Sequence, residues 1–213
     1  MKERRLILGL VIIIFAGAVY ALGWSSLFTV TAVQITGTDN PTTTSVKIGE
    51  KLARIQPRVV GAEFERFKWI ERADVSRNWL SGKVTITLTQ RRPIAIYEDQ
   101  AIDGFGIAFT VTNQRTEGLP QIQAGTIDAA VAGAQLFADL PVELAKNVKV
   151  LKVRSGDLYI LEMEIDGKSL QVIWGQDEEM ALKVKVYKAL LAQPENTKIR
   201  RIDVSAPNAP IVK

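Results

Sequence analysis

The stretch ADVSRNWLSGKVTITLTQ (residues 73–90) decides the fold of the first half of the chain. Apolar and polar residues alternate strictly over residues 84–90, which is typical of a strand buried on one face. Residues 73–79 alternate in the same way, and the Ser81-Gly82 pair between the two segments favours a turn. The stretch therefore predicts two antiparallel strands.

The segments before this stretch complete a small unit. A strand containing Val33 and Ile35 is expected first, because these residues alternate with polar ones. Ser45 can cap a helix that ends at Pro57, and a second short helix is expected after it. The predicted order is β-α-α-β-β within residues 28–96. The apolar residues at helical spacing are Ile48, Leu52 and Ile55, followed by Phe64, Phe67 and Ile70.

An uncharged apolar run, LILGLVIIIFAGAVYALGW (residues 6–24), precedes this unit. A helix of that length matches the hydrocarbon thickness of a bilayer, and the basic residues within residues 1–5 predict a short cytoplasmic tail. The alternative is a cleaved signal peptide, with Val19-Tyr20-Ala21 as the processing site. Because the run exceeds the roughly 7–15 apolar residues of a signal peptide, we expect a transmembrane helix over residues 6–24.

Residues 97–213 predict a second domain. Pro93 lacks the N–H that a central strand needs, so an edge strand or a domain junction is expected there. Asp166-Gly167 predicts a two-residue hairpin turn. The fold class is α+β, with a mainly antiparallel sheet in the second domain. The periodicity predicts helices around 127–137 and over 178–192, and strands over 148–153, 158–165 and 198–204.

The composition excludes several kinds of chemistry. The chain of 213 residues contains no cysteine and no histidine. Disulfides, zinc sites built on these residues, thiol nucleophiles and histidine-based triads are therefore excluded. The net charge is +4, and part of it lies in the N-terminal tail. The nearly balanced remainder predicts that the protein does not bind nucleic acid.

The motifs that resemble catalytic sites have simpler explanations. Gly167-Lys168-Ser169 resembles a phosphate-binding loop, but Glu162 stands where the motif requires a glycine. Glu164 shares a strand face with Glu162, as expected for the solvated side of a strand. Ser81 and Lys83 lie in a turn, without the burial that lowers the pKa of a lysine. We therefore expect no enzyme, no cofactor, no metal site and no small-molecule substrate.

Basic residues recur in the second half of the chain, at Lys152, Arg154, Lys198, Arg200 and Arg201. One interpretation is a solvated strand face. The other is a charged rim around a protein-binding edge, where such residues guide a partner.

Two runs resemble a known family. They are FTVTAVQITGT (residues 28–38) and FERFKWIERADVSRNWLSGKVTITLTQRRPIAIYE (residues 64–98). With these runs, the chain is similar to the bacterial cell-division FtsQ (DivIB) family along essentially its whole length. The residues that match the family pattern are Val33, Ile35, Gly37, Trp69, Ile70, Ala73, Val75, Arg77, Trp79, Arg91, Pro93, Ile94 and Ala95. Lys68 and Leu80 replace two usual prolines, Gln90 replaces a glutamate, and the N-terminal tail is short.

The resemblance implies a POTRA domain (residues 28–96) and an FtsQ-type β domain (residues 97–213) on a single-pass anchor. It implies an N-terminus in the cytoplasm, extracytoplasmic domains and a location at the division septum. Family members are non-enzymatic scaffolds of the divisome. They recruit FtsB (DivIC) and FtsL, and other septal-synthesis proteins are further expected partners.

The resemblance also implies a binding site at the C-terminal edge of the β domain. The expected edge is RRIDVSAPNAP (residues 200–210), where a partner strand can complete unpaired N–H and C=O groups and where Pro207 and Pro210 stop further pairing. At Ser205 and Ala206 this chain lacks the arginine and aromatic residue of some relatives. The alternative function is a cleaved, secreted or periplasmic protein-binding module. The expected partner-binding residues are Arg154, Arg200, Arg201, Ile202, Asp203, Val204, Ser205, Ala206 and Asn208.

Overall fold

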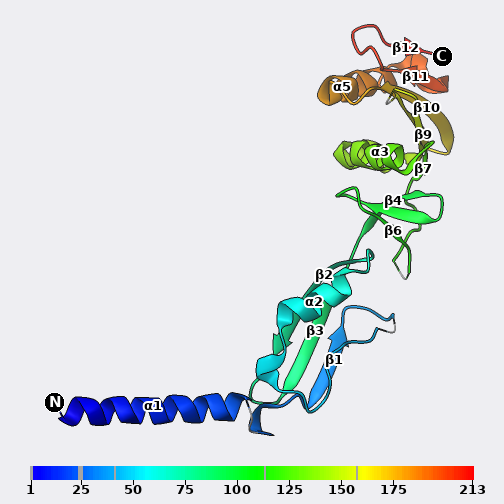
Figure 1. The fold of residues 1–213 in the computed structure, drawn as a ribbon. Coiled ribbons are helices and arrows are strands. Elements are labelled where there is room, and N and C mark those ends of the chain that lie inside the picture. Colours follow the sequence, from blue (N-terminus) through cyan, green and yellow to red (C-terminus); the bar gives the residue numbers. More distant parts are fainter. Residues whose placement is uncertain (1, 24–25, 41, 113, 157) are drawn as a thin grey trace. The chain divides into compact units, whose positions relative to one another are not determined.

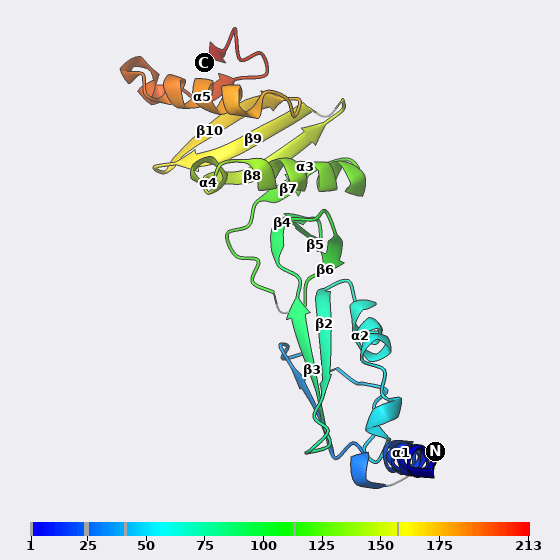
Figure 2. The same ribbon diagram turned by 90° about the vertical axis from the view of Figure 1, so that its left-hand side faces the viewer.

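The fold of the protein was analysed in a computed structural model. The structure describes residues 2–23, 26–40, 42–112, 114–156 and 158–213. It divides into two compact units, Met1–Arg91 and Arg92–Lys213 (Figures 1 and 2). Each unit has its own hydrophobic core.

The chain begins with helix α1 (Lys2–Gly23), so a helix forms where the apolar run predicts one. Within the described ranges, no helix is both long and apolar enough to cross a membrane. The predicted transmembrane helix is thus not confirmed, and Met1 and Trp24, which belong to the predicted tail and helix, lie outside the described residues.

The first unit contains a sheet with the strand order β1-β3-β2 (Figure 2). Strand β1 (Ala32–Thr36) is parallel to β3 (Lys83–Gln90), and β2 (Ile70–Arg77) is antiparallel to β3. The predicted strand pair is confirmed, because alternate residues of β3 fill the core beneath α2 (Pro57–Glu65). These residues are Val84, Ile86 and Leu88.

The two helices predicted for this unit are wrong in extent. Between Ser45 and α2 only a 3-10 turn, η2 (Leu52–Arg54), forms among the described residues, and the Ser45 hydroxyl donates to Glu63 Oε1 (2.7 Å) instead of capping a helix. Pro57 begins α2 rather than ending a helix. Proline is favoured at that position because its fixed φ suits the first turn, where its missing N–H costs nothing.

The second unit is built on one long mixed sheet with the order β12-β11-β10-β9-β8-β7-β4-β5-β6. The hairpin predicted at Asp166-Gly167 is confirmed, since both residues have positive φ and they join β9 to β10. The strands of this sheet are β4 (Pro93–Tyr97), β5 (Gln100–Asp103), β6 (Ala108–Thr110), β7 (Gln121–Gln123), β8 (Val148–Arg154), β9 (Leu158–Ile165), β10 (Lys168–Gly175), β11 (Arg201–Asp203) and β12 (Ile211–Val212).

The sequence left two interpretations of Pro93 open: the edge strand is wrong, whereas the domain junction agrees with the boundary between the two units after Arg91. Strand β4 lies inside the sheet, between β5 and β7. Pro93 is tolerated because it is the first residue of the strand, where a missing N–H does least harm. Along the chain, the boundary between the two compact units falls between Arg91 and Arg92, so β4 belongs to the second unit.

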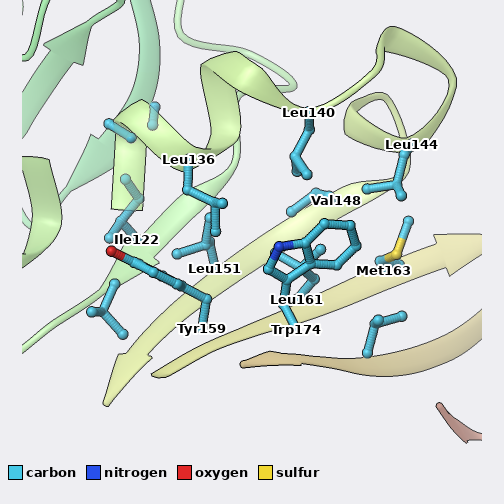
Figure 3. Packing of buried hydrophobic residues seen from close by; sticks show 14 of the residues in the cluster. Ile122, Leu136, Leu140, Leu144, Val148, Leu151, Tyr159, Leu161, Met163 and Trp174 are labelled. Carbon is cyan, nitrogen blue, oxygen red and sulfur yellow. The ribbon is translucent and has the colours of Figure 1, made fainter. Parts of the chain in front are cut away.

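Helices cover one face of this sheet (Figures 1 and 2). Thr126 caps the N-terminus of helix α3 (Ile127–Asp139), because its side chain accepts from the Ala129 N–H (3.2 Å). Helix α5 (Met180–Leu191) lies where the sequence predicts it, and the short helices α4 (Val142–Ala145) and η3 (Pro194–Lys198) follow α3 and α5. Figure 3 shows the core between helices and sheet, with Trp174 of β10 facing Leu140, Leu144 and Leu161.

Candidate protein-binding edge

The predicted binding edge lies in β11, which is paired on both sides. β11 runs parallel to β10 and antiparallel to β12, with Ile202 opposite Val212. The Arg201 N–H donates to the Lys213 carbonyl, and the Lys213 N–H donates to the Arg201 carbonyl (both 3.0 Å). The prediction that β11 forms the open edge is therefore wrong: the chain turns back after Asp203 and covers it with β12.

Two of the expected contact residues are core residues. Ile202 and Val204 are each 0% exposed and belong to the cluster that includes Trp174 and Tyr187. The Val204 N–H also donates to the Ile173 carbonyl (2.9 Å). Their side chains stabilise the unit and are not available to a partner.

Asp203 and Ser205 shape the loop that leaves β11. One carboxylate oxygen of Asp203 accepts from the Ser205 N–H (3.0 Å) and from the Ser205 hydroxyl (2.6 Å), which is the pattern of an Asx turn. The loop passes close to Gly175 at the end of β10. Gly175 has φ +77°, and a Cβ there would lie 2.7 Å from the Ser205 Cβ. Only glycine suits both the backbone conformation and the close contact.

The remaining loop residues are accessible. Ala206 and Asn208 are exposed, whereas Pro207 is buried, and the Ala209 N–H donates to the Ala206 carbonyl (2.9 Å) to close a turn. The prediction that Pro207 and Pro210 end the pairing is therefore wrong, because they lie in the connection that brings β12 beside β11.

Arg154 is separated from this loop. It ends β8, and β9 and β10 lie between it and β11, a distance of about 14 Å at the usual strand spacing. There it lines an open groove of about 570 Å³ together with Lys152, Glu98 and Gln123. Arg200 and Arg201 are exposed at the other end of this strand series, and the side chain of Lys198 lies outside the described part. The structure does not gather the basic residues into one patch.

The outermost strand of the sheet exposes residues that the sequence analysis missed. Ile211 and Val212 of β12 are 55% and 36% exposed. Arg201 and Lys213 exchange their backbone bonds, so the alternation of an antiparallel pair turns the N–H and C=O of Val212 away from β11. The apolar pair Ile211-Val212 directly after Pro210 could have indicated this short strand in the sequence.

A buried lysine fixes the neighbouring loop between β10 and α5. Lys183 is 2% exposed, its ammonium donates to the Gln176 carbonyl (2.6 Å), and it lies 5.8 Å from the Trp174 ring centre. Burial lowers the pKa of Lys183, and the nearby carboxylates of Asp177 and Glu178 oppose this shift. The bond holds the loop that follows Gly175, on which the Ser205 turn rests.

The residues considered for catalysis are engaged in other contacts. Glu162 forms an ion pair with Lys152 (2.5 Å), and Glu164 is exposed. The Ser81 hydroxyl accepts from the Lys83 N–H (3.4 Å) within the turn between β2 and β3. Among the residues that the structure describes, no three acidic residues are grouped so that they could hold a metal ion.

Comparison with known proteins identifies relatives over most of the chain. The model of the "Cell division protein FtsQ/DivIB, C-terminal" family matches residues 94–205. Proteins named cell division protein FtsQ are similar in Streptomyces venezuelae (27% identity, covering 94% of this chain and 80% of that protein) and in Streptomyces coelicolor (27%, 93% and 83%). The FtsQ of Streptomyces griseus is 30% identical over 67% of this chain and 73% of its own length. The chain therefore belongs to the FtsQ/DivIB family of cell division proteins.

Proposed function

We propose that this protein is a non-enzymatic scaffold of the divisome that recruits FtsB (DivIC)-like and FtsL-like proteins, and through them other septal-synthesis proteins. The partner adds a strand to the outer edge of β12. The observation that carries this proposal is that β12 ends the sheet with an outward-facing backbone and exposed apolar side chains.

Strand addition suits this edge for two reasons. The outward N–H and C=O of Val212 can bond to a partner backbone, which supplies affinity without a specific side chain. Val212 shares a sheet face with the buried Ile202, so a partner side chain beside it would extend the existing core. Ile211 offers a second apolar contact on the opposite face.

The expected contact residues then divide by role. Five exposed residues flank the edge and contact the partner directly: Arg200, Arg201, Ser205, Ala206 and Asn208. Asp203 acts through the turn that it forms with Ser205. Ile202 and Val204 act only by holding β11 in the core. Arg154 contacts the partner at a separate place, because β9 and β10 lie between it and β11.

A proline at the edge tests the proposal. Val212→Pro removes the outward N–H but none of the bonds between Arg201 and Lys213. We expect it to weaken binding of a peptide from the host's FtsB-like protein at least about tenfold, while Val212→Ala, which keeps the N–H, binds within about threefold of the natural chain. The measurement is a titration of the full chain in detergent by fluorescence anisotropy.

The result has two opposing outcomes. Equal affinity of the proline and alanine variants would exclude β12 as the added edge, and absence of binding by the natural chain would contradict the recruiting function. A circular dichroism spectrum that matches the natural chain establishes that the proline variant is folded.

We also propose that α1 holds the chain at the membrane of the division septum, with the N-terminal tail in the cytoplasm, and that the first unit is the POTRA domain. The apolar side chains of α1 are exposed: Phe15 is 70%, Ile13 69% and Tyr20 65% exposed. In water this surface would be costly, so a lipid environment suits it. N-terminal sequencing of the mature protein from whole host cells, with the membrane and soluble fractions kept apart, tests this, because a soluble chain that begins after residue 21 would instead support the cleaved, periplasmic alternative.

A further inference from the structure

We infer that the end of the first unit nearest to α1 is a lipid-binding surface that docks on an anionic bilayer. This membrane-binding tip consists of the turn Asn78–Lys83, the loop Lys47–Arg54 and the segment Leu27–Thr31. The inference goes beyond partner recruitment, and it rests in part on the proposal that α1 lies in a membrane.

Backbone contacts bring the three segments together. The Val30 N–H donates to the Glu50 carbonyl (2.8 Å), which joins the first segment to the loop. The Thr31 N–H donates to the Gly82 carbonyl (2.9 Å), which joins it to the turn. The rings of Phe28 and Trp79 meet edge to face, with centroids 6.0 Å apart. The segments therefore form one continuous end of the sheet.

Large apolar side chains on this tip point away from the core. Leu80 is 100% exposed, Leu27 76% and Ile48 73%, and Trp79 is 37% exposed. Neither folding nor the contacts within the unit explain an exposed leucine at the tip of a turn, and apolar residues gathered at one end mark an interaction surface. Tryptophan and leucine beside each other suit the boundary between headgroups and acyl chains.

The charge of the tip favours an anionic lipid surface over other apolar partners. Five basic residues lie in or beside the three segments, against the single carboxylate of Glu50. Arg77 is held by its bonds to the carbonyls of Leu52 (3.0 Å) and Ile55 (2.7 Å) and lies 5.3 Å from the Trp79 ring centre. Basic side chains close to a membrane are attracted by anionic headgroups. The basic residues are Lys47, Lys51, Arg54, Arg77 and Lys83.

Chain connectivity places the tip next to the proposed membrane segment. Helix α1 ends at Gly23, and η1 (Ser26–Phe28) already belongs to the tip. A span of so few residues between them cannot carry the unit far from a bilayer that holds α1. Leu80 and Trp79 then insert at the depth of the headgroups, which fixes the orientation of the first unit on the membrane.

The absence of natural cysteines permits a direct test with the full chain in vesicles. An environment-sensitive fluorophore is attached to Ser81→Cys in the turn, and, as the matched control, to Asp39→Cys beside Gly37, at the other end of β3. The vesicles contain phosphatidylglycerol, phosphatidylcholine and a lipid with a spin label high on its acyl chain. We expect the spin label to quench the fluorophore at position 81 at least about twofold more than that at position 39.

A second variant isolates the contribution of Leu80. Leu80→Ser in the Ser81→Cys background changes only a fully exposed side chain, and its unfolding temperature should equal that of the parent. We expect Leu80→Ser to lose most of the additional quenching at position 81. Vesicles of phosphatidylcholine alone should also lower this quenching, because each basic residue that contacts anionic headgroups shifts the docking equilibrium about fivefold.

The outcomes separate this inference from the proposed role of α1. If the chain floats with the vesicles but positions 81 and 39 are quenched equally, the membrane-binding tip is refuted and α1 remains the attachment. If the chain does not float with the vesicles, both proposals fail. Quenching at position 81 that persists in Leu80→Ser would also refute the insertion of Leu80.

Discussion

The two strands of the C-terminal hairpin differ sharply although they lie side by side. Ile202 of β11 and Val212 of β12 are directly opposite and share one face of the sheet, yet Ile202 is 0% exposed and Val212 36%. The difference arises because β11 lies over the core that contains Tyr187 of α5, whereas β12 is the last strand of the sheet. In this hairpin β11 contributes to the core, whereas β12 forms the outer edge of the sheet.

The largest expected effect is on stability. Ile202→Ala removes side-chain volume from a closed core, so we expect the free energy of unfolding to fall by about 2–5 kcal/mol. Val212→Ala, its partner across the hairpin, should cost about 1 kcal/mol or less, because Val212 is partly exposed. Urea unfolding of the full chain followed by tryptophan fluorescence measures both. Equal losses would show that β12 is as much part of the core as β11.

The same core should respond to alkaline pH. Burial raises the pKa of Tyr187 to about 12, and its hydroxyl donates to Met163 Sδ (3.8 Å). The folded-state pKa lies above the unfolded value of about 10, so this tyrosine's contribution is complete below pH 10. It is lost as the pH rises from about 10 to 12, with a maximum of about 2–3 kcal/mol.

Tyr187→Phe removes this dependence while keeping the ring in the core. The natural chain should lose stability more steeply than Tyr187→Phe between pH 10 and 12, in urea unfolding at each pH. The comparison between the two chains also cancels the opposite contribution of Lys183, whose lowered pKa makes folding more favourable as the pH rises. Parallel pH profiles would show that Tyr187 is not buried in the folded state.

A smaller effect is expected where the hairpin loop touches β10. Gly175→Ala strains a backbone with φ +77° and brings a Cβ within 2.9 Å of the Ser205 Cα, so a loss of about 1–3 kcal/mol is expected. Gly167→Ala is the matched control, since its φ is +74° but no atom lies within 4 Å of its added Cβ. The difference between the stability lost in Gly175→Ala and that lost in Gly167→Ala measures the contact with Ser205. Equal losses of stability would contradict this contact.

The smallest expected effect concerns the turn itself. Asp203→Ala removes both bonds to Ser205, and we expect a loss of about 0.5–1.5 kcal/mol together with weaker partner binding. Ser205→Ala removes only the hydroxyl bond and should cost less than Asp203→Ala. Thermal unfolding compares them. If Asp203→Ala lowered stability without changing partner affinity, the turn would not position the binding edge.

Much of the fold was predictable because it depends on local patterns. The alternation in residues 84–90 identified β3 and its buried face, and Asp166-Gly167 identified the hairpin between β9 and β10. Helix α5 followed from its apolar spacing. Side chains that alternate with a fixed period report which face is buried, and a two-residue turn determines the pairing of its strands.

The outer edge of the sheet could not be found in this way. The apolar residues Ile202 and Val204 resemble Ile211 and Val212 in sequence, and both pairs follow polar or proline-containing segments. Likewise Pro93 reads as an edge residue, although β4 lies inside the sheet. Periodicity gives the face of a strand, but the place of that strand in the sheet depends on which distant strands pair with it.

The sequence by itself determined the family, the main strands of both units, helices α3 and α5 of the second unit, and the absence of cysteine and histidine chemistry. Only the tertiary structure decided that β12 covers β11, that Ile202 and Val204 are buried, and that Arg154 is remote from the C-terminal loop. The physical reason is that local patterns arise from neighbouring residues, whereas edges and surfaces arise from hydrogen bonds and contacts between residues far apart in the chain.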